Sequence, residues 1–232
     1  MNRTLLVSLI AVTLTLTAST LTDAQSAPMQ RGISVQMVAT QNATRESSAD
    51  DPDAWIVTVT ADGKLYFGIN PVAPESLREE MKVRPRLRDA KLYIKADARA
   101  PFASVERVLE AARVDLFTGA VLLTSQPGQA EPGTIVPPKG LDVLVGPAVP
   151  NGTVATVVEL FSSGQQPLML KINDDQIPWS ALQGTLMQHF QKGDERVILL
   201  RADVHLPFAD VVGVIDLCRA AGAQVVLPAT TL

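Results

Sequence analysis

Two aspartates are the residues of this sequence whose type and setting come nearest to those of catalytic groups. Asp97 and Asp203 hold the same place in a repeated pattern, because Lys95–Val105 reads KADARAPFASV and Arg201–Val211 reads RADVHLPFADV. A carboxylate can act as a general acid or base. Each aspartate, however, falls where a strand is expected to end and a helix to begin, where it would accept backbone N–H groups and favour the positive end of the helix. The pattern therefore favours a structural role for both.

The residues that follow the two aspartates repeat as well. Pro101 and Pro207 suit the first turn of a helix, where the missing backbone N–H removes no hydrogen bond. Phe102 and Phe208 begin apolar helical patterns and are expected in the core. The sequence thus predicts a partner-binding or structural motif made of Asp97, Pro101, Phe102, Asp203, Pro207 and Phe208.

Other reactive side chains are few. His189 and His205 fall in different predicted elements and lack matching metal ligands. Cys218 is the single cysteine, which excludes an internal disulfide, and it lies on an apolar helix face as a small buried residue would. The chain has no Gly-x-Ser-x-Gly elbow, no His-Glu-x-x-His motif and no phosphate-binding loop. We therefore expect no enzyme, no metal site and no cofactor.

The composition excludes two classes of protein. Of the 232 residues, 47% are hydrophobic, which is too many for a mostly disordered chain. Lysine and arginine number 20 against 24 aspartates and glutamates, so the formal net charge is −4. Without a basic surplus to neutralise phosphates, nucleic-acid binding is not expected.

The elements that must position the motif also occur twice, with an offset of 106 residues between Asp97 and Asp203. Each copy reads as a hairpin, a helix, a strand, a second helix and a closing strand. In the first copy Gly63 marks the hairpin turn. Short leading strands are expected at Ile33–Val38 and Leu141–Val145. The predicted fold class is α+β, with two tandem copies of a small two-layer domain, each a mixed β-sheet with helices on one face.

The chain divides into four predicted segments. An N-terminal segment is followed by a first domain, a Pro/Gly linker and a second domain, at residues 1–27, 28–125, 126–139 and 140–232. In the first of these, Arg3 precedes an uncharged run over residues 4–22, which fits either a cleaved signal peptide or an N-terminal membrane anchor. Both readings take the rest of the chain out of the cytoplasm. The polar stretch Gln41–Asp53 is predicted to be a mobile loop.

The two copies resemble the periplasmic domain of the ExbD/TolR family of biopolymer transport proteins. The resemblance is carried by LYFGINPVAPESL and LYIKADARAPFASVERVLEAA in the first copy. In the second copy it is carried by the Ala202-Asp203 pattern and the Ala221-Gly222 step that ends the helix. It implies a location in the periplasm or on the periplasmic face of the inner membrane. It also implies an ExbB/TolQ-like membrane channel and a TonB/TolA-like protein as partners, with peptidoglycan as a further candidate.

Two features depart from the family pattern. The family has an aspartate in its transmembrane helix, whereas residues 5–14 of this chain contain no carboxylate, so no residue here can inherit its role in proton transfer. The tandem duplication is the second departure, and the copies are expected to pair either within one chain, about a pseudo-two-fold axis, or in a homodimer. The resemblance implies a non-catalytic accessory of proton-motive-force-driven biopolymer transport that acts through protein–protein contacts. The alternative is a soluble periplasmic module that binds peptidoglycan or a ligand without proton coupling.

Overall fold

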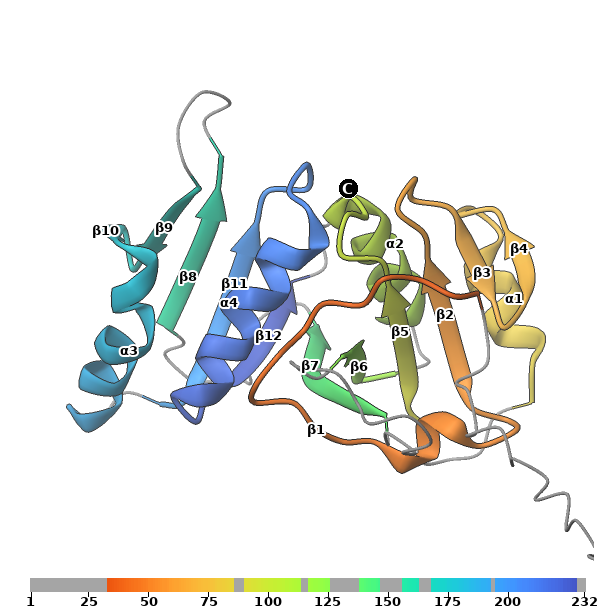
Figure 1. Cartoon of the computed structure of the whole chain (residues 1–232), viewed down its shortest axis with the longest axis horizontal. Coiled ribbons are helices and arrows are strands. Elements are labelled where there is room, and N and C mark those ends of the chain that lie inside the picture. The colour runs from red at the N-terminus through yellow and green to blue at the C-terminus, as the bar shows by residue number, and fades with distance from the viewer. Residues whose placement is uncertain are drawn as a thin grey trace, which may run out of the picture.

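A single mixed β-sheet joins the two copies. The computed structural model describes residues 33–85, 90–113, 117–125, 138–146, 156–162, 168–192 and 195–228. Within this part, twelve strands form the sheet, eleven of them in the order β10-β9-β8-β11-β12-β7-β6-β5-β2-β3-β4, and β1 pairs with β7 beside them. Figure 1 shows the second copy on the left and the first copy on the right of this sheet.

The same succession of elements builds each copy. The first copy consists of β2 (Trp55–Val59), β3 (Leu65–Phe67), β4 (Asn70–Val72), α1 (Leu77–Val83), β5 (Leu92–Ala96), α2 (Phe102–Arg113) and β6 (Gly119–Thr124). The second consists of β8 (Thr156–Phe161), β9 (Met169–Ile172), β10 (Asp175–Ile177), the 3-10 turn η2 (Trp179–Ala181), α3 (Leu182–Gln191), β11 (Val197–Ala202), α4 (Phe208–Ala220) and β12 (Gln224–Pro228). Three further elements are β1 (Thr44–Arg45), the 3-10 turn η1 (Ser47–Asp50) and β7 (Lys139–Gly146). The predicted α+β class and the duplication are confirmed.

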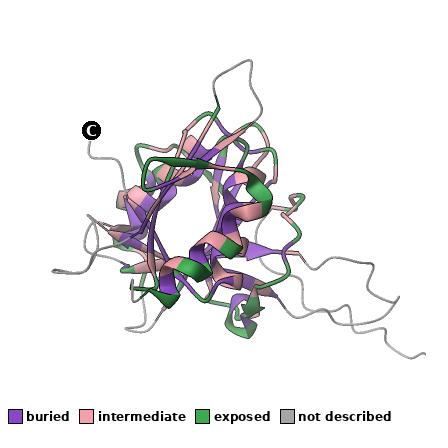
Figure 2. Cartoon of the chain, turned by 90° about the vertical axis from the view of Figure 1, so that its left-hand side faces the viewer, coloured by how far each residue is buried: buried purple, intermediate pink, exposed green. Residues whose placement is uncertain are grey.

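One hydrophobic core lies between the helices and the sheet and runs through both copies. Figure 2 shows the buried residues on the surfaces that the helices and the sheet turn toward each other. In α2, Phe102, Val105, Val108 and Leu109 are all buried, as the spacing of three and four residues predicts. Their counterparts in α4, which include Phe208, are buried in the same core. Because α2 and α4 each bury their apolar face in the same core, each copy stabilises the other.

The predicted leading strand of the second copy forms the centre of the sheet. Leu141–Val145 lies within β7, which pairs antiparallel with β6 and parallel with β12. The corresponding prediction for Ile33–Val38 is wrong, because no residue of that stretch belongs to a strand. The reason is that β6 and β12 leave room for one strand between them, and β7 pairs with both. The leading segment of the first copy is therefore excluded from the sheet.

The excluded segment crosses the junction as a strap, which we define as Gln36–Arg45. In Figure 1 it is the red-to-orange chain that runs from the first copy toward α4. An isolated parallel bridge joins Ala39 to Ser125, and the backbone N–H groups of Gln41 and Asn42 donate to the Asp216 carboxylate of α4 at 3.0 and 2.8 Å. The prediction of a mobile loop over Gln41–Asp53 is therefore wrong, since this stretch contains β1 and η1 and is fixed to both copies.

The chain after the strap covers the face of the sheet away from the helices. Ala49 of η1 packs with Ile56, Tyr93 and Leu123 in a second, smaller core. Among the described residues, no helix has the length and apolar character needed to cross a membrane. The predicted signal or anchor at residues 1–27 lies outside the described residues, as do residues 126–137 of the predicted linker.

Candidate interaction site at the junction of the two copies

The repeated motif is the place where the two copies bind each other. The loops that precede α2 and α4 run antiparallel and form an isolated bridge between Pro101 and Pro207. Four backbone hydrogen bonds join these loops: Phe102 N to Leu206 O at 2.9 Å, Phe208 N to Ala100 O at 2.8 Å, Ala103 N to Val204 O at 2.9 Å and Ala209 N to Ala98 O at 2.9 Å. When each residue is exchanged for its counterpart 106 residues away in the other copy, each of these bonds becomes another of the four. The junction therefore has the geometry of a pseudo-two-fold axis.

These bonds supply acceptors for the N–H groups at the start of each helix. The first N–H groups of a helix have no acceptor within the helix. In α2 and α4 the first two such groups donate to carbonyls of the other copy. Each copy thus caps the helix of its neighbour, and separation of the copies would leave both helix starts without these acceptors.

Asp97 lies in the strand-to-helix turn before α2 and accepts backbone N–H groups there, as the sequence predicts, but none of these belongs to the helix itself. Its Oδ1 accepts the backbone N–H of Arg99 at 3.1 Å, within the turn that precedes α2. Its Oδ2 accepts the backbone N–H of Gln36 at 3.1 Å. The Arg99 guanidinium donates to both oxygens and, with these N–H groups, lowers the pKa of Asp97 to about 2. Asp97 is therefore ionised at neutral pH and holds the strap to the turn.

Asp203 occupies the equivalent turn with fewer partners. Its Oδ1 accepts the backbone N–H of His205 at 2.9 Å and lies 3.3 Å from Nδ1 of the same residue. Its side chain is 33% exposed, whereas the side chain of Asp97 is only 5% exposed. The difference follows from the strap, which contacts Asp97 and not Asp203.

The prolines and phenylalanines of the motif have distinct places. Pro207 is the N-cap residue of α4, so it precedes the helix instead of occupying its first turn as predicted. Pro101 likewise precedes α2, which begins at Phe102. The prediction that Phe102 and Phe208 lie in the core is confirmed, with exposures of 2% and 0%. The structure thus gathers the prolines and phenylalanines of both copies at one junction, with each aspartate in the adjoining turn.

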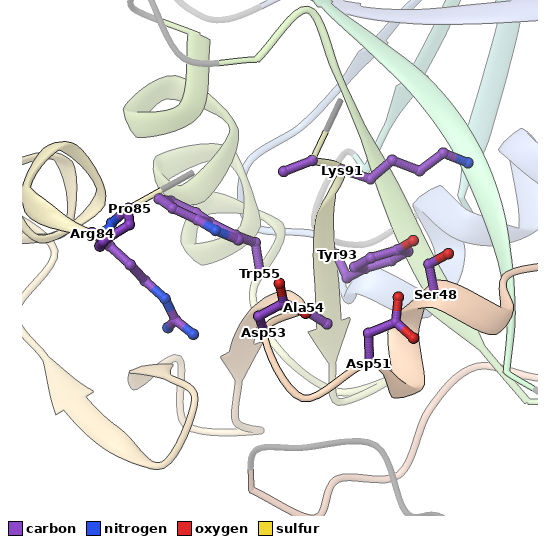
Figure 3. A pocket seen from close by; sticks show the side chains of 10 residues that line it. Ser48, Asp51, Asp53, Ala54, Trp55, Arg84, Pro85, Lys91 and Tyr93 are labelled. Carbon is purple, nitrogen blue, oxygen red and sulfur yellow. The ribbon is translucent and has the colours of Figure 1, made fainter. Parts of the chain in front are cut away.

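A second feature, which the sequence reasoning missed, is an open hollow of about 670 Å³ on the first copy. In Figure 3 the Arg84 guanidinium lies at one side of it, and the hydroxyls of Tyr93 and Ser48 lie with the Asp51 carboxylate at the other. The Arg84 guanidinium carbon is 5.6 Å from the centroid of the Trp55 ring, which fits a cation–π contact. Charges of both signs around an aromatic wall suit a polar ligand that also carries both signs.

Burial keeps two ionisable side chains, Tyr93 beside the hollow and Cys218 in the core, in their protonated forms. Burial, with the Glu46 carboxylate nearby, raises the pKa of Tyr93 to about 12, so its hydroxyl stays protonated at neutral pH. Burial also raises the pKa of Cys218 to about 12, and its side chain is fully buried as predicted. Within the described ranges, no group of three or more His, Cys, Asp or Glu residues could hold a metal ion.

Comparison with known proteins places the chain in a family. The sequence model of the family described as biopolymer transport protein ExbD/TolR matches residues 4–127 and again residues 129–231. These two adjacent matches cover most of the chain, so the protein belongs to the ExbD/TolR family, with two copies in tandem. No curated protein and no solved structure matches the chain.

Proposed function

We propose that this protein is a non-catalytic accessory of proton-motive-force-driven biopolymer transport that works through protein–protein contacts in the periplasm. Membership of the ExbD/TolR family gives a role in biopolymer transport. The observation that carries the finer proposal is the reciprocal pairing of the two repeated motifs. One chain then presents a fixed pair of domains to its partners.

The proposed partners are an ExbB/TolQ-like membrane channel and a TonB/TolA-like protein. Residues 5–14 contain no carboxylate, so proton transfer in such a complex is assigned to the partners and not to this chain. The proposed location is the periplasm or the periplasmic face of the inner membrane. Residues 1–27 act there as a signal peptide or as an anchor.

Affinity purification of the full chain from its native envelope tests this proposal. We expect an ExbB/TolQ-like subunit to be recovered in stoichiometric amount, as measured by mass spectrometry. A matched purification through the same tag on an unrelated periplasmic protein gives the background. Recovery of the chain without any such subunit, in both gentle detergent and cross-linked preparations, would contradict the proposal.

A second candidate function is that of a periplasmic module that binds peptidoglycan or a ligand without proton coupling. The hollow beside Trp55 supports it, because Arg84 and Asp51 together match a ligand with both a carboxylate and an amine. Co-sedimentation with purified cell-wall sacculi tests this candidate. Arg84→Ala should then reduce the bound fraction, whereas Lys64→Ala, at an exposed position outside the hollow, should not.

A further inference from the structure

The pseudo-two-fold axis relates the groove that holds the strap to a second groove on the other side of the junction. The strap lies between the turn at Asp97, the end of β6 and α4. The equivalent groove lies between β11, the end of β12 and α2, and it encloses a cavity of about 250 Å³. Its wall includes Phe102, Leu109, Leu200 and Leu227, so its base is apolar.

Exposure shows how differently the two grooves are covered. Ala96 is fully buried beside the strap, while its counterpart Ala202 is half-buried. Lys95 is buried, but its counterpart Arg201 is exposed. In the register of the closing strands β6 and β12, Pro228 is the counterpart of Leu123. Leu123 is fully buried, whereas Pro228 is half-buried. The second groove therefore has the same form as the first, but no segment among the described residues covers it.

The strap shows which groups bind an extended chain in such a groove. Gln36 O accepts the backbone N–H of Ala98 at 2.8 Å, and Gln36 N donates to Asp97. At the other end, Asp216 accepts two consecutive backbone N–H groups. A segment of about seven residues is thus held by backbone contacts at both ends, and Met37, Val38, Ala39 and Thr40 lie between them.

The second groove carries the same binding groups. Val204 takes the place of Ala98, and no acceptor for its N–H is present in the part of the chain that the structure describes. Asp203 takes the place of Asp97, and both of its contacts with His205 are made through Oδ1 and not through Oδ2. Glu110 takes the place of Asp216, and its carboxylate makes no hydrogen bond or ion pair within the described ranges. The counterpart of Ser125 is residue 230, which lies outside them.

The chain's own leading segments do not supply an occupant. The leading segment of the second copy is β7, which pairs along both edges in the centre of the sheet. The strap itself is fixed through β1 to β7 and through the Glu46–Lys91 ion pair of 2.9 Å just beyond it. A second copy of the chain has its strap fixed in the same way.

We infer that the second groove is a docking site for an extended, neutral-to-basic segment of another protein. The inference rests on the proposed function and deepens it by naming the surface that a partner would use. The segment would accept the Val204 N–H with a backbone carbonyl and place two consecutive N–H groups, or a basic side chain, against Glu110. Small or branched apolar side chains between these ends would enter the cavity, as Val38 of the strap packs on the main core.

A synthetic peptide with the strap's own sequence, residues 33–45, is the probe for this site. It is titrated into the full chain, and binding is measured by fluorescence anisotropy. We expect saturable binding of one peptide per chain. Glu110→Gln, or N-methylation of the peptide at the positions of Gln41 and Asn42, should weaken binding about tenfold, as expected for a hydrogen bond to a charged acceptor.

Asp216→Asn is the matched control, because Asp216 is the equivalent residue of the groove that the strap fills. If the peptide binds by replacing the strap, Asp216→Asn should strengthen binding and Glu110→Gln should leave it unchanged; that result would overturn the inference. Absence of saturable binding, or a strap-exchanged dimer seen by light scattering, would overturn it too. None of these results bears on the recovery of a channel subunit, so the proposed function is judged separately.

Discussion

Replacement of Asp97 by asparagine tests how the strap and the first copy's turn depend on one charge. The carboxyl accepts the backbone N–H groups of Gln36 and Arg99 and pairs with the Arg99 guanidinium. A carboxyl whose pKa falls from 3.8 to about 2 on folding contributes at most about 2.4 kcal/mol at neutral pH. The Arg99 side chain is 70% exposed, so solvent screening lowers the expected loss to about 1–2 kcal/mol.

The sign of the pH dependence follows from the lowered pKa. The contribution of Asp97 is complete above its ordinary pKa of 3.8, and it is lost as the pH falls through the range from 3.8 toward 2. Urea unfolding of the wild type and of Asp97→Asn should therefore differ at pH 7 and nearly coincide at pH 2.

The duplication supplies an internal control for this experiment. Asp203→Asn removes the equivalent carboxylate, which is more exposed and holds no strap, so its cost should be under about 1 kcal/mol. Equal losses for the two variants, or a difference at Asp97 that persists unchanged at pH 2, would refute the reasoning.

Three further predictions concern the strap, the core and the thiol. Asp216→Asn should weaken two hydrogen bonds to the strap and raise amide exchange rates over residues 36–45; unchanged exchange would show that Asp216 does not fasten it. Phe208→Ala should lower the free energy of unfolding by about 3–5 kcal/mol in a denaturant titration, because the ring is fully buried, and a loss under about 1 kcal/mol would contradict this packing. Cys218 should react with an aromatic disulfide reagent only after unfolding, since burial keeps its thiol protonated, and rapid labelling of the native protein at pH 8 would contradict its place in the core.

Much of each copy could be predicted from residue spacing. The apolar positions of α2 and α4 recur every three or four residues, which identifies the face that each helix buries. Asp62-Gly63 identifies the first hairpin, and Gly63 indeed has a φ of 78° at that turn. These features depend on neighbours close in sequence, so local chemistry is enough to predict them.

The arrangement of the copies depends on contacts that spacing does not show. Ile33–Val38 reads as a strand as well as Leu141–Val145 does, but only one of them fits between β6 and β12. Residue spacing places both aspartates in strand-to-helix turns, but it does not show that carbonyls of the other copy accept the first N–H groups of the helices. The hollow was missed because Asp51 and Arg84 are distant in sequence and meet only when the chain after the strap folds against the sheet.

Cross-linking across the junction tests most directly whether the two copies pair within one chain. Pro101 and Pro207 face each other in a bridge without direct hydrogen bonds, where Cα atoms lie about 4.5 Å apart, within the range for a disulfide. The double variant Pro101→Cys/Pro207→Cys, oxidised in dilute solution, should give a single-chain product that has lost two hydrogens in its intact mass. Free thiols, or disulfides formed only between two chains, would contradict the intramolecular pairing.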